Sequence, residues 1–353
     1  MKKSFWKNKR VLITGSTGFK GTWLTHLLNK LNCKVYGYSL LNNTERYYFY
    51  NKTIKKKINF KKSNVINLIE IKKTINKIKP DIIFHLAAQP IVSLSYQYDL
   101  NTIQSNIIGT ANILHSLKDY EKQISVVFIT TDKVYKNSLK PNKINYFSEN
   151  NELGGDDIYS ASKASCELLI SSYQQSFFKN TNVSIVSARA GNVIGGGDFS
   201  KDRIIPDIVK SQKQKKIVMI RNPNHIRPWQ HVLDVLHGYL LLVEKIHCKK
   251  NFDLSWNFSP QKKTIKTVGN LVLEYMKYSK NILNFEFVNE NLINEKPILL
   301  LDSNKARKIL NWTDRLSFQE TIKLTSSWYD SYLNNENLNF ITNKQINYFL
   351  KLK

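Results

Sequence analysis

Two short segments of the sequence hold side chains whose types and spacing suit acid–base chemistry. In YSASK, Tyr159 and Lys163 are four residues apart, so a helix places the phenol and the ammonium on one face. A neighbouring cation lowers the pKa of a phenol, which lets the phenolate act as a base near neutral pH. An apolar run that ends at residue 130 leads into Thr131, Asp132 and Lys133, which add a hydroxyl, a carboxylate and a second ammonium.

Three glycines near the start of the chain have the spacing of a dinucleotide-binding turn. Gly15, Gly18 and Gly21 lie directly after an expected strand at 11–14 and at the beginning of an expected helix at 19–31. The first glycine permits the tight turn, the second lets the backbone approach a diphosphate, and the third lets helix and strand pack closely. The loop therefore predicts a dinucleotide cofactor whose diphosphate rests on the helix N-terminus.

The second expected strand, at 34–38, lacks the acidic residue that usually holds the ribose hydroxyls of NAD. The chain continues there as Tyr38, Ser39 and Leu40, and Arg46 is the one nearby arginine that could meet a 2′-phosphate. This feature alone leaves the choice between NAD and NADP open.

A sheet must bring these segments together, and the alternation of apolar runs predicts one. Expected strands at 11–14, 34–38, 81–86, 125–130 and 183–188 alternate with expected helices at 19–31, 67–78, 101–118 and 159–178. This alternation predicts an α/β fold, a Rossmann-type doubly wound parallel sheet with a smaller mixed C-terminal substrate-binding lobe.

The same pattern suggests how the chain is divided. We expect the dinucleotide-binding domain over 1–190, with later segments at about 225–260 able to return to it, and the lobe over 191–330. Residues 331–353 read as an Asn-rich tail, which we expect to be loosely held over 334–347.

Length and composition exclude several other classes. The chain has 353 residues, 42% of them hydrophobic, and no run of about 18 apolar residues that would predict a membrane span. The first residues are charged, unlike a signal peptide. Cys33, Cys166 and Cys248 are odd in number and widely spaced, which argues against a disulfide framework or a metal site and favours a cytoplasmic protein.

The formal net charge of +26 invites a nucleic-acid interpretation. The charge comes from 45 Lys against only 8 Arg, and Lys is abundant together with Asn and Ile along the whole chain. We interpret this as a compositional bias with solvated lysines, and we expect neither a nucleic-acid nor a membrane partner.

Seven motifs together resemble one family of sugar-nucleotide enzymes. They are TGSTGFKG (14–21), HLAAQP (85–90), TTDKVY (130–135), YSASK (159–163), RAGNVIGGGD (189–198), DRIIPD (202–207) and IRPWQHV (226–232). In combination they resemble the CDP-glucose 4,6-dehydratases, which belong to the extended short-chain dehydrogenases/reductases, over about residues 5–315. The resemblance implies a lyase that holds NAD and converts CDP-glucose into its 4-keto-6-deoxy product by internal hydride transfer.

The resemblance also implies a role for each residue of the two segments. Tyr159 would take the proton of the sugar 4-hydroxyl, and Lys163 would lower the pKa of Tyr159 and hold the nicotinamide ribose. Thr131 would hydrogen-bond the reacting oxygen, and Asp132 would protonate the leaving 6-hydroxyl. Lys133 stands where the thymidine-linked dehydratases have Glu, so either Lys133 or a water molecule would remove the C5 proton.

Binding residues follow from the same motifs. The implied cofactor set is Gly15, Thr17, Gly18, Phe19, Lys20, Gly21, Asn64, Val65, Leu86, Ala87, Ala88, Thr130, Tyr159 and Lys163. The implied substrate set is Gln89, Asn192, Arg203 and Arg227. No metal is implied.

Arginine usage supports a diphosphate site independently. Half of the arginines fall within 189–227, namely Arg189, Arg203, Arg221 and Arg227. A guanidinium binds phosphate in a bidentate geometry that lysine does not reproduce. Arg189 and Arg221 are the weaker candidates, because the resemblance gives them no role.

Three ring side chains near the motifs carry less information. Trp229 and His231 suit either the core or the site. His85 ends a strand, and we expect its role to be structural.

The sequence departs from the family pattern at three places. Ser93 stands where the family usually has Arg, and 63–65 reads Ser-Asn-Val where it usually has Gly-Asp-Ile. Asn64 would then meet the adenine amino group through its carbonyl. At 294–296 the chain reads Asn-Glu-Lys where the family has His-Glu-Ala.

Other functions stay open at this point. The alternatives are another sugar-nucleotide 4,6-dehydratase or an epimerase with a UDP- or GDP-linked substrate, and, more remotely, a non-catalytic nucleotide-binding protein. The resemblance further implies self-association, as a homodimer or homotetramer, through helices at about 100–118 and 158–178, and a product used in cell-surface polysaccharide such as lipopolysaccharide O-antigen.

Overall fold

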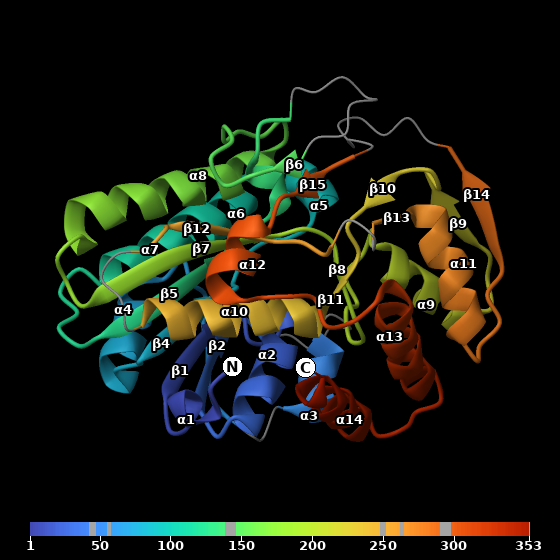
Figure 1. Ribbon diagram of the computed structural model, residues 1–353, viewed down its shortest axis with the longest axis horizontal. Coiled ribbons are helices and arrows are strands. Elements are labelled where there is room, and N and C mark those ends of the chain that lie inside the picture. The colour runs from blue at the N-terminus through green and yellow to red at the C-terminus, as the bar shows by residue number, and fades with distance from the viewer. Residues whose placement is uncertain are drawn as a thin grey trace.

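The computed structural model describes residues 1–41, 47–54, 58–137, 146–247, 252–261, 265–289 and 298–352. Among these residues, seven parallel strands form one sheet in the order β12-β7-β5-β4-β1-β2-β3 (Figure 1). The strands are β1 (Arg10–Thr14), β2 (Lys34–Ser39), β3 (Asn59–Lys62), β4 (Ile82–His85), β5 (Ile124–Ile129), β7 (Val183–Ala190) and β12 (Ser255–Phe258). The order reverses direction between β1 and β4, which is where such sheets bind ligands at their carboxyl ends.

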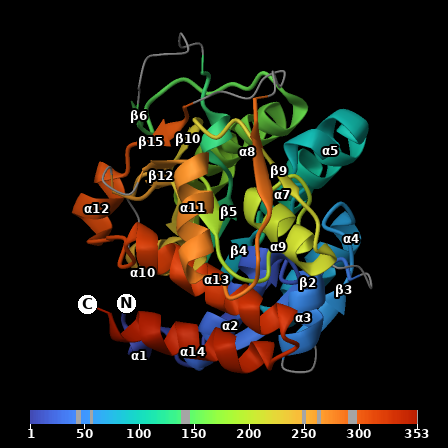
Figure 2. The same cartoon turned by 90° about the vertical axis from the view of Figure 1, so that its right-hand side faces the viewer.

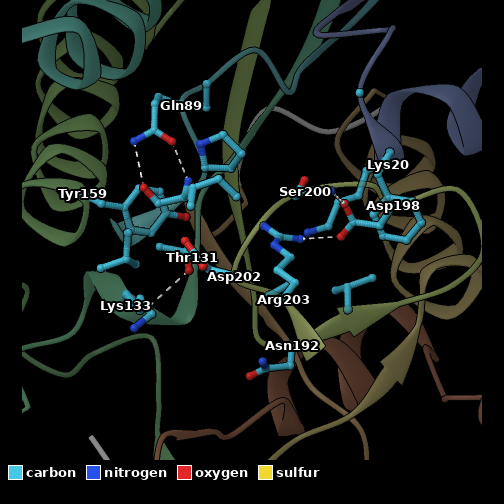
Figure 3. A pocket seen from close by; sticks show the side chains of 18 of the residues that line it. Lys20, Gln89, Thr131, Lys133, Tyr159, Asn192, Asp198, Ser200, Asp202 and Arg203 are labelled. Carbon is cyan, nitrogen blue, oxygen red and sulfur yellow. Dashed lines mark hydrogen bonds and ion pairs between the residues drawn. The ribbon is translucent and has the colours of Figure 1, made fainter. Parts of the chain in front are cut away.

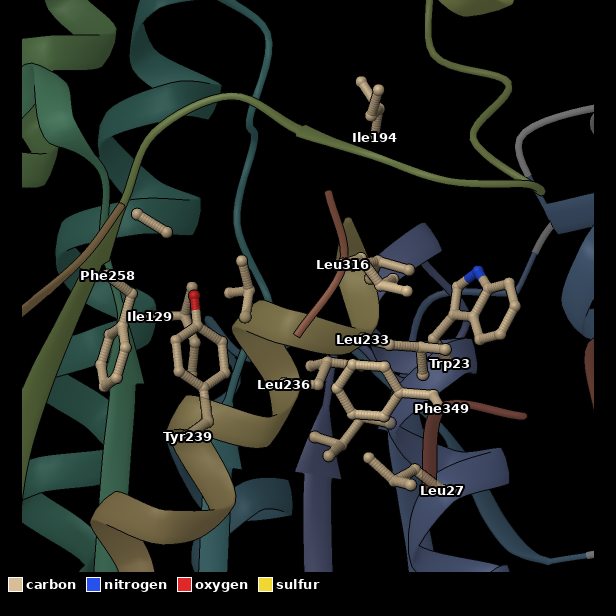
Figure 4. Close-up of a cluster of buried hydrophobic side chains, with 14 of the residues drawn as sticks. Trp23, Leu27, Ile129, Ile194, Leu233, Leu236, Tyr239, Phe258, Leu316 and Phe349 are labelled. Carbon is tan, nitrogen blue, oxygen red and sulfur yellow. The ribbon is translucent and has the colours of Figure 1, made fainter. Parts of the chain in front are cut away.

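Helices cover both faces of this sheet. One face carries α2 (Phe19–Lys30) and α10 (Val232–Ile246), and the other carries α4 (Leu68–Ile78), α7 (Gly109–Ser116) and α8 (Ile158–Tyr173). Side chains of a strand alternate between the faces. Val11 and Ile13 of β1 therefore belong to the same buried cluster as Trp23 and Leu236, whereas Leu12 belongs to the cluster on the opposite face. Figure 4 shows Trp23 and Leu236 within the first cluster. The prediction of a doubly wound Rossmann-type sheet is confirmed.

The expected long helices at 101–118 and 159–178 are interrupted. The first consists of α6 (Asp99–Ile103), a π-helical turn (Gln104–Ile108) and α7, and it follows α5 (Val92–Gln97). The second is α8 followed by a π-helical turn at Gln174–Phe178. Both helices pack against each other along one side of the molecule.

A smaller mixed region lies beside the carboxyl ends of the strands, at the right of Figure 1. It contains α9 (Ile204–Gln214), α11 (Val268–Tyr278) and the parallel pair β9 (Val218–Arg221) and β14 (Phe285–Val288). Three further pairs of two-residue strands connect it to the rest: β8 (Val193–Ile194) with β11 (Gln230–His231), β10 (Ile226–Arg227) with β13 (Lys266–Thr267), and β6 (Tyr146–Phe147) with β15 (Leu300–Leu301). Two later elements return to the main sheet: β12 pairs with β7, and α10 packs on one face of the sheet.

The remaining helices are α1 (Lys3–Trp6), α3 (Tyr48–Thr53), α12 (Asn304–Leu310), α13 (Phe318–Leu333) and α14 (Leu338–Lys351). The expectation of a loosely held Asn-rich tail is wrong, because 334–347 runs into α14. The Asn337 side chain caps this helix by accepting a hydrogen bond from the Phe340 backbone. Leu338, Ile346 and Phe349 are buried against the core, and α14 lies beside α3 and α13, close to the N-terminus (Figure 2).

Candidate active site

A cavity of about 970 Å³ opens at the carboxyl ends of β1, β4 and β5, facing α9 and β9. Every residue that the sequence analysis assigned to the cofactor, the substrate or the chemistry lines it. These residues come from segments that are far apart in the chain, so the parallel sheet is what brings them together. Figure 3 shows the side chains of Thr131, Lys133 and Tyr159 on one side of the cavity and those of Lys20, Asp198 and Arg203 on the other.

The glycine loop has the geometry that its spacing predicts. Gly15 has a positive φ of +71°, and a Cβ on Gly21 would lie 2.3 Å from the Gly15 carbonyl oxygen. A Cβ on Gly18, by contrast, would meet only that same oxygen at 3.4 Å, so the space above Gly18 is open to the cavity. Gly18 also stands at the N-cap of α2, where unpaired backbone N–H groups favour an anion. The loop is therefore suited to a diphosphate.

Hydroxyl groups occupy the position where the acidic residue of β2 is missing. Thr17 and Ser39 share a hydrogen bond of 2.7 Å between their hydroxyl oxygens, and Thr17 also hydrogen-bonds the Leu40 carbonyl at 3.0 Å. Asn64 and Val65 lie just beyond β3 and line the cavity, and the Asn64 side-chain oxygen accepts from the Ile66 backbone at 3.2 Å. Arg46, Cys248 and residues 294–296 lie outside the described residues.

The segment from Thr131 to Lys133 follows β5 and forms one 3₁₀ turn (Asp132–Val134). The Thr131 hydroxyl donates to the Asp132 carboxylate at 2.9 Å, and both side chains are buried. Burial raises the pKa of Asp132, against the lowering effects of Lys133 and of the Thr131 hydrogen bond. The Lys133 side chain is half-buried at the same cavity wall. The turn therefore presents a carboxyl group that holds its proton more firmly than an exposed aspartate does.

Tyr159 and Lys163 lie in the first turns of α8, whose N-cap Asp157 accepts from the Ser160 backbone. Burial raises the pKa of Tyr159 to about 12, while the Thr131 hydrogen bond and Arg203 act in the opposite direction. Lys163 donates to the Ile129 carbonyl at 3.1 Å, and burial lowers its own pKa. Loss of solvation therefore dominates the pKa of Tyr159 in the polypeptide, and the lowering of that pKa by Lys163 stays a prediction.

Arginines of the C-terminal region fall into two groups. Arg203, Arg221 and Arg227 line the cavity, and Arg203 forms an ion pair of 3.0 Å with Asp198. Arg189 is 3% exposed and pairs with Glu167 at 2.7 Å, away from the cavity. Arg189 therefore does not belong with the arginines that line the cavity. It lies near them in sequence because β7 ends just before the loop that leads to Arg203.

Lys20 and Gln89 both line the cavity; burial changes the pKa of the first, and hydrogen bonds within the protein hold the second. Burial and the charge of Arg203 lower the pKa of Lys20 to about 8. The side-chain amide of Gln89 is hydrogen-bonded within the protein, accepting from the Ile91 backbone at 2.6 Å and donating to Thr102 at 3.0 Å. Asn192 and Arg227 also line the cavity, and both are half-buried.

The ring side chains take structural positions. His85 hydrogen-bonds Thr14 at 2.7 Å and Thr110 at 3.3 Å, and burial lowers its pKa to about 3, in line with the structural role expected for it. His231 is fully buried against Trp23. Trp229 is 4% exposed but lines the cavity, and its indole N–H donates to the Lys266 carbonyl at 3.2 Å.

Three acidic residues of the quoted motifs line the cavity although the sequence analysis gave them no role. They are Asp198, Asp202 and Asp207. Asp202 accepts a 2.5 Å hydrogen bond from Ser93, the residue that replaces the family arginine. Burial and Asp202 raise the pKa of Asp207 to about 6. Only the motifs themselves signalled these positions, since loop aspartates have no periodicity that would distinguish them.

The described residues lack two kinds of feature. They contain no helix that is long and apolar enough to cross a bilayer. They also contain no group of three or more His, Cys, Asp or Glu side chains placed to hold a metal ion.

Comparisons with known proteins agree with this architecture. The family model described as GDP-mannose 4,6 dehydratase matches residues 12–325. The CDP-glucose 4,6-dehydratase of Salmonella typhimurium is 36% identical over 354 residues, which cover 99% of this chain and 98% of that protein.

Solved structures share the fold. The dTDP-glucose 4,6-dehydratase of Bacillus anthracis, solved with NAD, superposes with a TM-score of 0.74 at 21% identity over 92% of this chain and 97% of its own. The UDP-glucose-4-epimerase of Stenotrophomonas maltophila, solved with NAD and a formylated UDP-arabinopyranose, gives 0.80 at 18% identity over 93% of this chain and all of its own.

Proposed function

The chain belongs to the GDP-mannose 4,6-dehydratase family of NAD-dependent epimerases and dehydratases, and from this premise we propose that it converts CDP-glucose into CDP-4-keto-6-deoxyglucose. One observation carries the reaction type: the Thr131–Lys133 turn and the Tyr159–Lys163 pair line one cavity with the glycine loop. The full-length similarity to a CDP-glucose 4,6-dehydratase supports the cytidine nucleotide.

NAD fits the cofactor half of the cavity. The turn at Gly15 and the open space above Gly18 form a cradle that a larger residue would fill, and the N-terminus of α2 faces it. When bound, NAD accepts the hydride of sugar C4 and returns it to C6. Gly15, Thr17, Gly18 and the adjoining Phe19–Gly21 turn would hold its diphosphate, and Lys163 its nicotinamide ribose. The Thr17–Ser39 hydroxyl pair in place of an acid still allows hydrogen bonds to an uncharged ribose.

In the first half-reaction Tyr159 takes the proton of the sugar 4-hydroxyl. Burial raises the pKa of Tyr159, so its phenolate is a strong base, and Arg203 beside the cavity helps to form it. The Thr131 hydroxyl also lowers the pKa of Tyr159 and so favours the phenolate.

In the second half-reaction the C5 proton and the 6-hydroxyl leave. The new 4-keto group makes the C5 proton acidic, and Lys133 on the cavity wall removes it. Asp132 supplies a proton to the departing hydroxyl, which leaves as water, and the proton taken by Lys133 would return to C5 when hydride is delivered to C6. The raised pKa of Asp132 keeps a fraction of the carboxyl protonated at higher pH than usual, as a general acid requires.

Arg203, Arg227 and Asn192 line the cavity, and we expect them to hold the diphosphate of the substrate. The decisive test offers the purified protein CDP-glucose, UDP-glucose, GDP-mannose and dTDP-glucose in parallel and measures the 4-keto product by its absorbance in alkali. Product from CDP-glucose at a kcat/KM at least about 100-fold above the others supports the assignment. Turnover of a UDP- or GDP-linked sugar instead would refute it in favour of the alternative substrates.

We further propose that two copies of the chain associate through α6, its π-helical turn and α8. Leu100, Ile108 and Leu168 on these packed helices are 66%, 44% and 59% exposed, a clustering of apolar surface that a second copy would cover.

The widely spaced cysteines support a reducing, cytoplasmic setting for the activity. We also propose that the product feeds a cell-surface polysaccharide.

A further inference from the structure

A buried ion pair lies behind the cavity wall, between α8 and β7. The side chains of Glu167 and Arg189 are 2% and 3% exposed and are 2.7 Å apart. Burying two charges is costly unless their remaining hydrogen-bonding groups are also satisfied. The partners that satisfy these two residues therefore indicate what the pair does.

Glu167 holds the residue that precedes the catalytic turn. Its Oε1 accepts a 2.5 Å hydrogen bond from the hydroxyl of Thr130, the residue between β5 and Thr131. Its Oε2 accepts from Ser187 at 2.6 Å and from Arg189. Thr130 is thereby fixed to α8 as well as to the sheet.

Arg189 holds the residue that follows the catalytic turn. Its Nη1 donates to the phenol oxygen of Tyr135 at 2.8 Å, and its Nη2 donates to Ser255 at 2.9 Å as well as to Glu167. The Tyr135 hydroxyl in turn donates to the Asn257 side chain at 2.8 Å, and its ring stacks on Phe147. Tyr135 is 2% exposed, so this arrangement is fixed on all sides.

Thr130 and Tyr135 bracket Thr131, Asp132 and Lys133. Glu167 lies one helical turn beyond Lys163 on α8 and two turns beyond Tyr159, so the three share a face of that helix. We propose that Glu167 and Arg189 are positioning residues, which clamp both ends of the 131–133 turn to the helix that carries the proposed base. The clamp sets the distance between the acid–base groups of the two half-reactions without itself touching substrate.

This inference rests on the proposed function. The least disruptive variant that tests it removes one hydroxyl group. Tyr135→Phe deletes the contact with Arg189 and leaves the ring in place. The matched control is Tyr120→Phe, which deletes a 2.7 Å hydrogen bond from a phenol to the Pro80 carbonyl, far from the cavity. We expect Tyr135→Phe to lower kcat for CDP-glucose about 10-fold or more with KM within about two-fold, because small misplacement of catalytic groups costs rate rather than binding.

Arg189→Lys tests the pair itself. A lysine keeps the charge opposite Glu167 but has no planar fork to reach Tyr135 at the same time. The same fall in kcat, in a variant whose unfolding temperature stays within a few degrees of the parent, supports the clamp. A kcat equal to that of Tyr120→Phe in both variants would overturn it.

A readout independent of substrate separates this proposal from the proposed function. Amide hydrogen exchange of the segment 130–137, measured by mass spectrometry, should quicken about five-fold or more in Tyr135→Phe and Arg189→Lys but stay unchanged in Tyr120→Phe. Unchanged exchange in all three contradicts the clamp, whatever the activity. If the unmodified protein turns over no sugar nucleotide while the exchange responds as expected, the proposed function fails and the clamp stands.

Discussion

The hydroxyl of Thr131 donates a 2.9 Å hydrogen bond to the Asp132 carboxylate and also lowers the pKa of the neighbouring Tyr159 phenol. One small side chain thus connects the proposed acid of the elimination with the proposed base of the oxidation. Burial raises the pKa of both groups, and the Thr131 hydrogen bond is a lowering influence on each. The hydroxyl therefore moderates the protonation of two groups that act in successive steps.

Replacing Thr131 by Val should shift the pH dependence of turnover. Elimination needs Asp132 protonated, so kcat falls as pH rises through the raised pKa of that carboxyl. Without the hydrogen bond the carboxylate is less stabilised, and the descending limb of the kcat profile should move up by about one pH unit, the equivalent of one hydrogen bond. Profiles of kcat against pH measure this, and a limb that moves to lower pH would contradict the assignment of Asp132 as the acid.

Lys133→Met should stop the elimination and spare the oxidation. The half-buried Lys133 side chain, acting through its neutral amine, is the proposed C5 base, so its loss should slow exchange of the C5 proton with D₂O by about 100-fold or more. Bound NADH should still form on mixing with substrate. Lys136→Met is the control, because Lys136 lies three residues beyond Lys133 but is exposed and forms an ion pair with Glu152. Undiminished C5 exchange in Lys133→Met would show that water or another residue is the base.

Two glycine variants should separate folding from cofactor binding. Gly21→Ala forces a Cβ against the Gly15 carbonyl at 2.3 Å, so it should destabilise the protein by about 1–3 kcal/mol or more. Gly18→Ala meets nothing closer than 3.4 Å and should leave stability near the parent while weakening NAD binding. Thermal unfolding and NAD titration measure the two effects. Equal NAD affinity in Gly18→Ala and the parent would place the diphosphate elsewhere.

Buried histidines should make the fold sensitive to mild acid. Burial lowers the pKa of His85, His231 and His237 to about 3, from 6.5 when solvated. The unfolded chain therefore binds more protons between these values, and the free energy of unfolding should fall as pH drops below 6.5, by up to about 1.4 kcal/mol per pH unit for each ring.

His237→Leu tests the contribution of one ring, whose two nitrogens lack hydrogen-bond partners among the described residues. Denaturant unfolding at several pH values should show a slope between pH 6 and pH 4 that is reduced by one proton, with the exposed His115→Gln as control. An unchanged slope would mean that the ring is charged in the folded protein.

Leu168→Arg should weaken self-association. Leu168 is 59% exposed on the proposed contact face, and a buried unpaired charge there would oppose pairing. Leu273→Arg on α11, where the residue is 50% exposed, is the control for the charge alone. Sedimentation should show dimers for the parent and the control but monomers for Leu168→Arg. Dimers in all three would place the contact on another surface.

The cavity could be predicted from sequence because its parts are short motifs tied to strand ends. A parallel sheet has one carboxyl edge, so Gly15, Thr130 and Thr131 had to meet once their strands were identified. The glycine spacing even anticipated the 2.3 Å contact that excludes a side chain at Gly21.

What could not be predicted depends on which way a side chain points and how deeply it is buried. Arg189 is close in sequence to Arg203, but strand alternation on β7 turns it towards Glu167. The spacing of Tyr159 and Lys163 is visible in sequence, whereas the loss of solvation that raises the pKa of the phenol is not. The asparagines of 334–347 suggested a loop, yet Asn337 is a helix cap and Leu338 and Phe349 form an apolar side.

The central claim is that one bound NAD carries hydride from C4 to C6 of the same sugar, and an isotope experiment tests it most directly. The protein should be incubated with CDP-glucose deuterated at C4, and the product examined by NMR. The account predicts deuterium at C6 of a 4-keto-6-deoxy sugar, within the molecule that supplied it. Recovery of a C4 epimer with deuterium still at C4, or of no product from CDP-glucose, would contradict it.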